Sequence, residues 1–231
     1  MTDITRTLEI LDRLIAFPTV SRDSNLDLID WVQNLLQTAE FDVTRIWSPD
    51  CTKAGLFARI GPGVDGGVCL SAHTDVVPVD GQVWTRPPFQ LTDEGARVYG
   101  RGTTDMKGFL ASALALAERA GETPLSAPLS LSISYDEEIG CVGIRHMMPD
   151  LKQLIGNPRL VIVGEPSSMQ VATGHKGKAA LKVTCHGQAG HSALAPQFVT
   201  CIGGCDAWIE VQSLEFFSAA ILLAKRYNAT I

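Results

Sequence analysis

The stretch GVCLSAHTDVVP, residues 67–78, passes from small apolar residues into a histidine and an aspartate that stand two positions apart. Its first half is short, β-rich and bounded by glycines, as expected of a strand. His73 and Asp75 therefore stand where this strand ends. Two interpretations follow: either the pair helps to hold a metal ion, or it is only the polar end of a strand.

Strand and helix patterns alternate around this stretch. Before it, the spacing of apolar residues predicts two helices and then two short strands, at residues 4–17, 26–40, 43–47 and 54–60. After it, a helix, a strand, a second helix and an apolar strand follow, at residues 106–120, 129–135, 141–155 and 160–164. This order favours parallel strands joined by right-handed crossovers. The sequence therefore predicts an α/β fold with a mostly parallel sheet, helices on both faces, and a last strand that is covered on both sides.

The composition excludes several classes of protein. A net charge of −6, from 25 acidic and 19 basic residues, argues against a nucleic-acid surface. The apolar stretch at 216–224 is shorter than the roughly 20 residues that cross a bilayer, and the N-terminus lacks the layout of a secretory signal. The six cysteines form no C-x-x-C pair, which favours reduced thiols in a cytoplasm. We therefore expect a cytoplasmic globular protein that binds neither nucleic acid nor membrane.

Carboxylates gather at the ends of the predicted strands. Those that follow a strand or precede the long helix are Asp75, Asp105, Asp136, Glu137, Glu138 and Glu165. Taken singly, each has an ordinary explanation, such as a helix cap at Asp105 or solvated loop charges at Glu137 and Glu138. Parallel strands, however, open at one edge of their sheet, so these carboxylates are expected to converge there with His73.

Such a cluster implies bound cations. Several carboxylates at one site repel one another and lose hydration unless positive charge neutralises them. Histidine and carboxylate ligands suit zinc first, with cobalt or manganese as alternatives. The cluster holds more carboxylates than one tetrahedral ion with an open position requires, which favours two ions that share an aspartate. Of the adjacent Glu137 and Glu138, one would bind metal and the other would act as a general base.

Four motifs occur in a characteristic order, namely SAHTDVVP, GRGTTDMKG, YDEEIG and VGEPS. In order and approximate spacing they resemble the zinc aminoacylase and carboxypeptidase superfamily. Within it the chain is most similar to the acetylornithine deacetylase branch, through VGEPSSMQVATGHKG and GQAGHSALAP, and the resemblance covers roughly residues 5–199. It implies a zinc-peptidase-like catalytic domain followed by an α+β lid and dimerisation domain.

The resemblance also implies which residues bind metal. His73 and Glu165 would bind one ion, Asp105 would bridge to a second ion, and Glu138 would bind that second ion. The family holds two zinc ions per subunit, with cobalt as the alternative.

Three further residues would serve catalysis by the same resemblance. Asp75 would orient His73 through its ring N–H. Glu137 would activate the attacking water and later protonate the leaving amine. His191, in GHSAL, would belong to the lid and reach the partner subunit's site to stabilise the oxyanion, although a plain turn residue is the alternative there.

The match to the family ends at about Val199. We therefore expect a catalytic domain at residues 1–174 and, at 175–231, the start of a lid and dimerisation domain with an atypical tail from about residue 200. Relatives continue through the rest of the lid and supply a further metal-binding histidine. Our hypothesis is that the tail results from a shift of reading frame. If so, family-like sequence should resume in another frame of the encoding DNA. The family implies a homodimer, and the short lid argues against one here.

These expectations converge on one function. The resemblance implies a metal-dependent amide hydrolase that removes the acetyl group from N-acetylornithine, a small N-acyl amino acid, during arginine synthesis. A succinyl-diaminopimelate desuccinylase or a dipeptidase is the alternative within the same chemistry, because the metal motifs do not read the acyl group. A non-catalytic fragment that binds metal without turnover is the alternative from another class.

Overall fold

The computed structural model describes residues 4–172, 174, 182–184 and 208–210. They divide between two compact units. Residues 4–172 belong to the first unit, which carries the candidate site. The second unit contains β8 (Lys182–Thr184) and β9 (Trp208–Glu210), which pair antiparallel.

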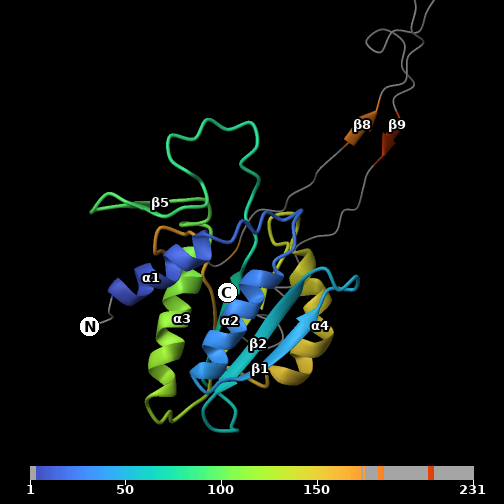
Figure 1. Cartoon of the computed structure of the whole chain (residues 1–231). Helices are drawn as coiled ribbons and strands as arrows, with labels where there is room; N and C mark the ends of the chain where they lie inside the picture. Colours follow the sequence, from blue (N-terminus) through green and yellow to red (C-terminus); the bar gives the residue numbers. More distant parts are fainter. Residues whose placement is uncertain (1–3, 173, 175–181, 185–207, 211–231) are drawn as a thin grey trace, which may run out of the picture. The chain divides into compact units, whose positions relative to one another are not determined.

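The first unit contains the predicted helices and strands in the predicted order (Figure 1). Its helices are α1 (Ile4–Ile15), α2 (Leu26–Thr38), α3 (Lys107–Gly121) and α4 (Val142–Leu154). Its main strands are β1 (Asp42–Trp47), β2 (Ala54–Ile60), β3 (Val68–His73), β6 (Leu129–Ser134) and β7 (Leu160–Val163). A two-stranded ribbon of β4 (Thr92–Asp93) and β5 (Val98–Tyr99) interrupts the path from β3 to α3. No helix among the described residues has both the length and the apolar character needed to span a bilayer.

The five main strands form one sheet in the order β1, β2, β6, β3, β7. β3 pairs parallel with both β6 and β7, whereas β2 runs antiparallel to β1 and to β6. Four of the five strands therefore point the same way, which confirms the mostly parallel sheet. The parallel register pairs His73 with Ser134, so β3 and β6 end side by side.

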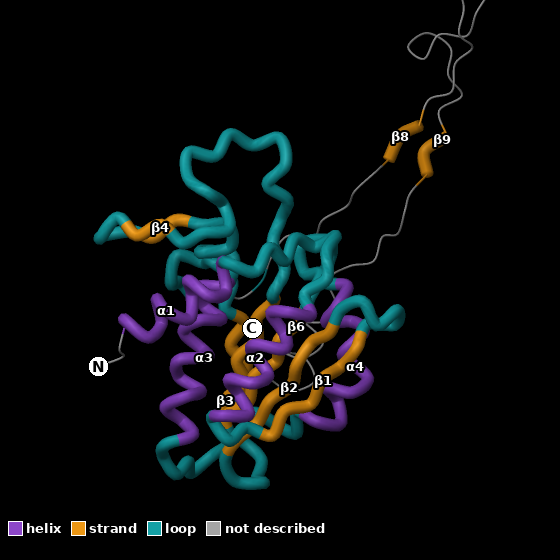
Figure 2. The backbone as a smooth tube through the Cα atoms, in the orientation of Figure 1, coloured by secondary structure: helices purple, strands orange, loops and turns teal. Residues whose placement is uncertain are grey.

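Helices cover both faces of the sheet, as predicted. α2 and α3 contact strands on one face, with α1 packed on α3, and α4 contacts β1, β2 and β6 on the other (Figure 2). Each face has its own apolar core, and the strands serve both because alternate side chains point in opposite directions. Leu56 and Ala58 of β2 pack into the core under α1 to α3, while Phe57 between them packs against α4.

The last strand differs from the prediction that it is covered on both sides. β7 lies at the edge of the sheet and pairs only with β3 among the described strands. Leu160, Ile162 and Val163 are 51%, 40% and 47% exposed. That prediction is therefore wrong for the described part of the chain. The apolar residues of β7 predict a buried strand. Whether a strand is covered, however, depends on which other elements pack against it, and the sequence of the strand does not show that.

Candidate metal centre

The candidate site lies where the connections of the sheet change direction. β3 leads through α3 to β6 on one side, and β6 leads through α4 across β3 to β7 on the other. The chain leaves the carboxyl ends of these strands toward opposite faces of the sheet, which is the usual position of a ligand site in this fold class. A cavity of about 240 Å³ opens there, lined in part by Asp105 and Glu138.

His73, the last residue of β3, is 1% exposed and stands at the centre of the site. Its Nδ1 lies 3.0 Å from the main-chain oxygen of Asp75 and 3.3 Å from the Oδ1 of the same residue. Its Nε2 lies 3.2 Å from Oδ1 of Asp105. One ring nitrogen is thus held by the protein core, and the other points toward carboxylates.

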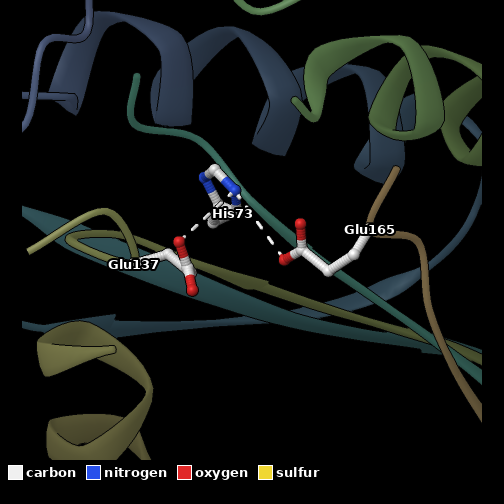
Figure 3. Close-up of side chains that lie close together, drawn as sticks. All are labelled: His73, Glu137 and Glu165. Atoms are coloured by element: carbon white, nitrogen blue, oxygen red, sulfur yellow. Dashed lines mark ion pairs between the residues drawn. The ribbon is translucent and has the colours of Figure 1, made fainter. Parts of the chain in front are cut away.

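Two glutamates flank the same imidazole from separate strand ends. Oε2 of Glu137 and Oε1 of Glu165 each lie 3.9 Å from Nε2 of His73, and in Figure 3 they approach the ring from the left and from the right. Glu137 follows β6 and Glu165 follows β7, so the predicted convergence of residues from three parallel strands is present.

Asp75 connects the imidazole to the loop that carries the paired glutamates. It is 3% exposed, and its carboxylate accepts hydrogen bonds from the main-chain N–H of Glu137 at 3.0 Å and of Glu138 at 3.2 Å. The hydroxyl of Ser21 donates to the same carboxylate at 2.7 Å. Asp75 therefore fixes the ring and the glutamate backbone together.

Asp105 is placed by the start of α3. Its peptide bond to Met106 is cis, and the sulfur of Met106 accepts a hydrogen bond from the main-chain N–H of His73 at 3.2 Å. The buried ammonium of Lys107 donates to the carbonyl oxygens of Leu14 and Phe17, at 2.9 and 2.8 Å. This lysine anchors the first turn of α3 to the end of α1.

The loop between β6 and α4 presents the two glutamates. Asp136 and Cys141, at its two ends, both have left-handed backbone angles, with φ of 54° and 55°. A Cβ atom at Gly143 would lie 2.0 Å from the carbonyl oxygen of Tyr135, so only glycine lets α4 approach the strand end this closely. The thiol of Cys141 donates to Oε1 of Glu137 at 3.3 Å.

The charges of the site shift its pKa values. Burial alone would lower the pKa of His73, but hydrogen bonds to Asp105 and Asp75 raise it to about 10. Burial raises the pKa of Glu165 to about 7, and the negative charges of Asp105 and Glu137 add to that effect. Burial and the charge of Asp105 also raise the pKa of Glu138. The site therefore holds more negative charge than its own groups balance.

The donor atoms fit a divalent metal ion. Two groups of side chains bring donor atoms within 4.8 Å of one another, namely His73 with Glu137 and Glu165, and His73 with Asp105 and Glu138. Imidazole and carboxylate are ligands of zinc and similar ions. Burial is the main cause of the raised pKa of Glu165, and a cation would offset both this burial and the added repulsion from Asp105 and Glu137.

The structure brings together most of the residues named from the sequence. His73, Asp75, Asp105, Glu137, Glu138 and Glu165 form one cluster. Asp136 instead turns away to an ion pair with Lys53. His191 lies outside the described residues, so its predicted role stays a prediction. Sequence patterns did not reveal the contributions of Ser21, Lys53 and Cys141; only Cys141 had a usable signal, its position directly after the YDEEIG motif.

Comparisons with known proteins place this geometry in a family. The model of Peptidase family M20/M25/M40 matches residues 69–220. An acetylornithine deacetylase of Shigella sonnei is 37% identical over 193 residues, and one of Buchnera aphidicola is 32% identical over 192 residues. Each alignment takes in 80% of this chain and 49% of the relative. The chain thus spans about half the length of the curated relatives that it matches.

Solved structures support the fold. Human carnosine dipeptidase 1 superposes with a TM-score of 0.62 at 20% identity, covering 87% of this chain and 46% of that one. A tripeptidase of Staphylococcus aureus superposes with a TM-score of 0.63 at 14% identity, covering 87% of this chain and 54% of that one. At such identities the likeness concerns the fold alone.

Proposed function

Since this chain belongs to Peptidase family M20/M25/M40, we propose that it is the N-terminal part of a metal-dependent amide hydrolase acting on small N-acyl amino acids. The observation that carries the proposal is the meeting of one buried imidazole with carboxylates from separate strand ends. As substrate we propose N-acetylornithine, because the relatives at 37% and 32% identity are named acetylornithine deacetylase.

The metal ligands proposed here are those of the cluster. By the family resemblance, His73 and Glu165 would hold one ion, Glu138 would hold a second, and Asp105 would serve both. The donor atoms of these residues fall into two groups that share His73, namely His73 with Glu137 and Glu165, and His73 with Asp105 and Glu138. Zinc is the first choice of ion and cobalt the alternative. A bound divalent ion supplies Lewis acidity toward the substrate carbonyl and lowers the pKa of a water molecule.

Glu137 is the proposed general base. Its Oε1 accepts a hydrogen bond from Cys141, and its Oε2 faces the imidazole of His73. It takes a proton from the attacking water and returns a proton to the amine that leaves when the C–N bond breaks, so that acid and amine are released. Asp75 keeps the imidazole oriented through both steps.

The remaining predictions extend the proposal to the whole protein. Residues 1–174 would form the catalytic domain, and residues 175–231 would begin a lid and dimerisation domain that contributes His191 to a partner subunit. The proposed assembly is a homodimer in the cytoplasm. Whether this chain forms the dimer depends on the lid segment at residues 175–231.

A direct test is hydrolysis by the purified chain after loading with Zn²⁺ or Co²⁺. The substrates are N-acetylornithine, N-succinyl-diaminopimelate and a dipeptide, because a desuccinylase or a dipeptidase would use the same metal site. We expect N-acetylornithine to be cleaved fastest and Glu137→Gln to abolish turnover while bound metal stays. Loss of metal in that variant would instead show that Glu137 binds metal and that Glu138 is the general base.

A second candidate is a fragment that binds metal without turnover. The exposed apolar side chains of β7 favour it, because they leave one edge of the catalytic sheet uncovered in the described residues. Metal counting separates the two candidates: two tightly held ions per chain support the hydrolase, whereas one ion or none supports the inert fragment.

A further inference from the structure

Lys53 lies beneath the loop that carries the paired glutamates, outside every motif of the family. It ends the turn between β1 and β2, where its main-chain N–H donates to the hydroxyl of Ser48 at 2.9 Å. Its ammonium group lies 2.5 Å from Oδ1 of Asp136, and the two side chains are each only 12% exposed. The ammonium also donates to the main-chain oxygen of Ser21.

These contacts close a ring of interactions behind the metal centre. Lys53 binds Ser21 and Asp136, and Ser21 donates through its hydroxyl to Asp75. Asp75 in turn accepts the main-chain N–H groups of the two residues after Asp136. A change at Lys53 therefore reaches the glutamate backbone by two routes, through Asp136 directly and through Ser21.

The backbone of Asp136 needs such support. Its φ of 54° is a conformation that residues other than glycine rarely adopt. Such a conformation costs free energy, and it persists only where neighbouring contacts offset that cost. This angle turns the chain at the end of β6, so it decides where Glu137 and Glu138 point. The main-chain oxygen of Asp136 also accepts the N–H of Val142, which connects the same residue to α4.

The ion pair is better suited to fixing a position than to adding stability. Removing two charges from water offsets much of their attraction, so a buried pair adds little net stability, yet leaving one member unpaired is costly. In this protein, we infer that the pair acts by selecting one arrangement of the groups that it joins. Here those groups are the start of the glutamate loop and the loop that contains Ser21.

We propose that Lys53 is a positioning residue of the metal centre, which holds Asp136 in its left-handed conformation and so sets the backbone of Glu137 and Glu138. This proposal rests on the proposed function only for the roles of Glu137 as general base and Glu138 as metal ligand. The geometric claim can be tested in the metal-free protein without any turnover.

The primary test is amide hydrogen exchange in the metal-free full chain. In Lys53→Met, the amides of Glu137 and Glu138 should exchange about tenfold faster, because neighbours in one network couple by an amount of that order. Amides in the middle of β3 and β6 should keep their rates. The control is Lys152→Met, which removes an exposed lysine from α4 and should change none of these rates.

Metal affinity supplies a readout that a purely structural role would not move. We expect Zn²⁺ to bind about tenfold more weakly to Lys53→Met than to the Lys152→Met control, as for other groups that orient metal ligands. Lys53→Arg keeps the positive charge and should restore most of the affinity. If Lys53→Met does not fold, Asp136→Asn removes the partner charge at constant shape and should give the same local pattern.

The measurements distinguish failure of the positioning role from failure of the proposed function. Unchanged exchange at Glu137 and Glu138, or an increase that the strand amides share equally, would overturn the proposal. Unchanged zinc affinity would overturn it as well. If instead the parent chain hydrolyses no substrate while the local exchange pattern appears, the proposed function fails and the positioning role stands.

Discussion

The imidazole side of the candidate metal centre is buried in the core, whereas the carboxylate side is about half exposed to solvent. The side chains of His73 and Asp75 are 1% and 3% exposed, and those of Asp105 and Glu165 are 46% and 42% exposed. Both sides contribute donor atoms to the same small region.

This difference separates two tasks. The buried side has its orientation fixed by the protein itself, through the hydrogen bonds of Asp75 to the ring, to Ser21 and to the glutamate backbone. On the more exposed side, the pKa values of Glu138 and Glu165 are raised, so these carboxyl groups can exchange a proton for a cation. Glu138 lines the cavity together with Asp105. Substitutions on the buried side should therefore change folding as well as ligand binding, whereas those on the exposed side should change ligand binding alone.

The largest effect is expected from Asp75→Ala. It leaves His73 without its buried partner and two main-chain N–H groups without an acceptor, so the free energy of unfolding of the metal-free chain should fall by about 3–5 kcal/mol. Urea denaturation measures it. Asp80→Ala, at an exposed carboxylate, is the control and should change stability far less. Equal stability of the two variants would show that the buried side of the metal centre does not contribute to folding as proposed.

Glu165→Gln should show the opposite pattern. The pKa of Glu165 is raised by burial and by neighbouring negative charge, so a neutral side chain should not lower the stability of the metal-free chain. Zinc affinity, measured by calorimetry, should fall at least about tenfold. The control is Glu122→Gln at an exposed site. A large loss of stability with unchanged zinc affinity would show that Glu165 serves folding instead.

Metal affinity should rise with pH. The raised pKa values, about 10 for His73 and about 7 for Glu165, mean that both groups bind protons near neutral pH in the metal-free chain, and a metal ion must displace them. Zinc affinity should increase from pH 6.5 to 8.5, by about tenfold per unit for each proton displaced. Calorimetry in buffers of different ionisation enthalpy counts the protons released. An affinity that does not depend on pH would contradict this account.

The raised pKa of His73 also makes the stability of the metal-free chain depend on pH. Because the pKa of His73 in the folded chain lies above its ordinary value of 6.5, the stability contributed by the imidazolium is complete below that pH. It is lost as the pH rises toward 10. Denaturation of the metal-free chain across this range would show it, and His73→Asn should flatten the curve.

The smallest effect is expected at Cys141. Burial and the charge of Glu137 raise the pKa of its thiol to about 12, so the thiol stays protonated and donates to the proposed general base. Cys141→Ala should lower kcat about threefold with little change in KM, and Cys141→Ser should restore most of the rate. Cys51→Ala, at an exposed cysteine, is the control. Identical kcat values in all three variants would remove Cys141 from the account.

The elements that the sequence predicts well are those whose signal is local. The short apolar run before His73 and the helical spacing of apolar residues in α3 depend on neighbouring residues, and the motifs mark the strand ends directly. The convergence of Asp105 and Glu165 on His73 then follows from the rule that parallel strands open at one edge.

The residues that the sequence does not reveal act through distant contacts. Ser21 lies 54 positions from Asp75, and Lys53 lies 83 positions from Asp136, with no periodic pattern that joins them. The exposure of β7 was missed for a related reason. An apolar run signals a need for cover, while the elements that could provide it lie elsewhere in the chain or assembly.

The central claim is that His73 and the surrounding carboxylates bind divalent metal together. Titration of Zn²⁺ into the metal-free chain and into His73→Ala tests it most directly. We expect about two ions bound per parent chain and an affinity at least about tenfold weaker in the variant. If the parent chain binds no zinc, or if the variant binds it as tightly as the parent, then His73 and the carboxylates do not form a metal site.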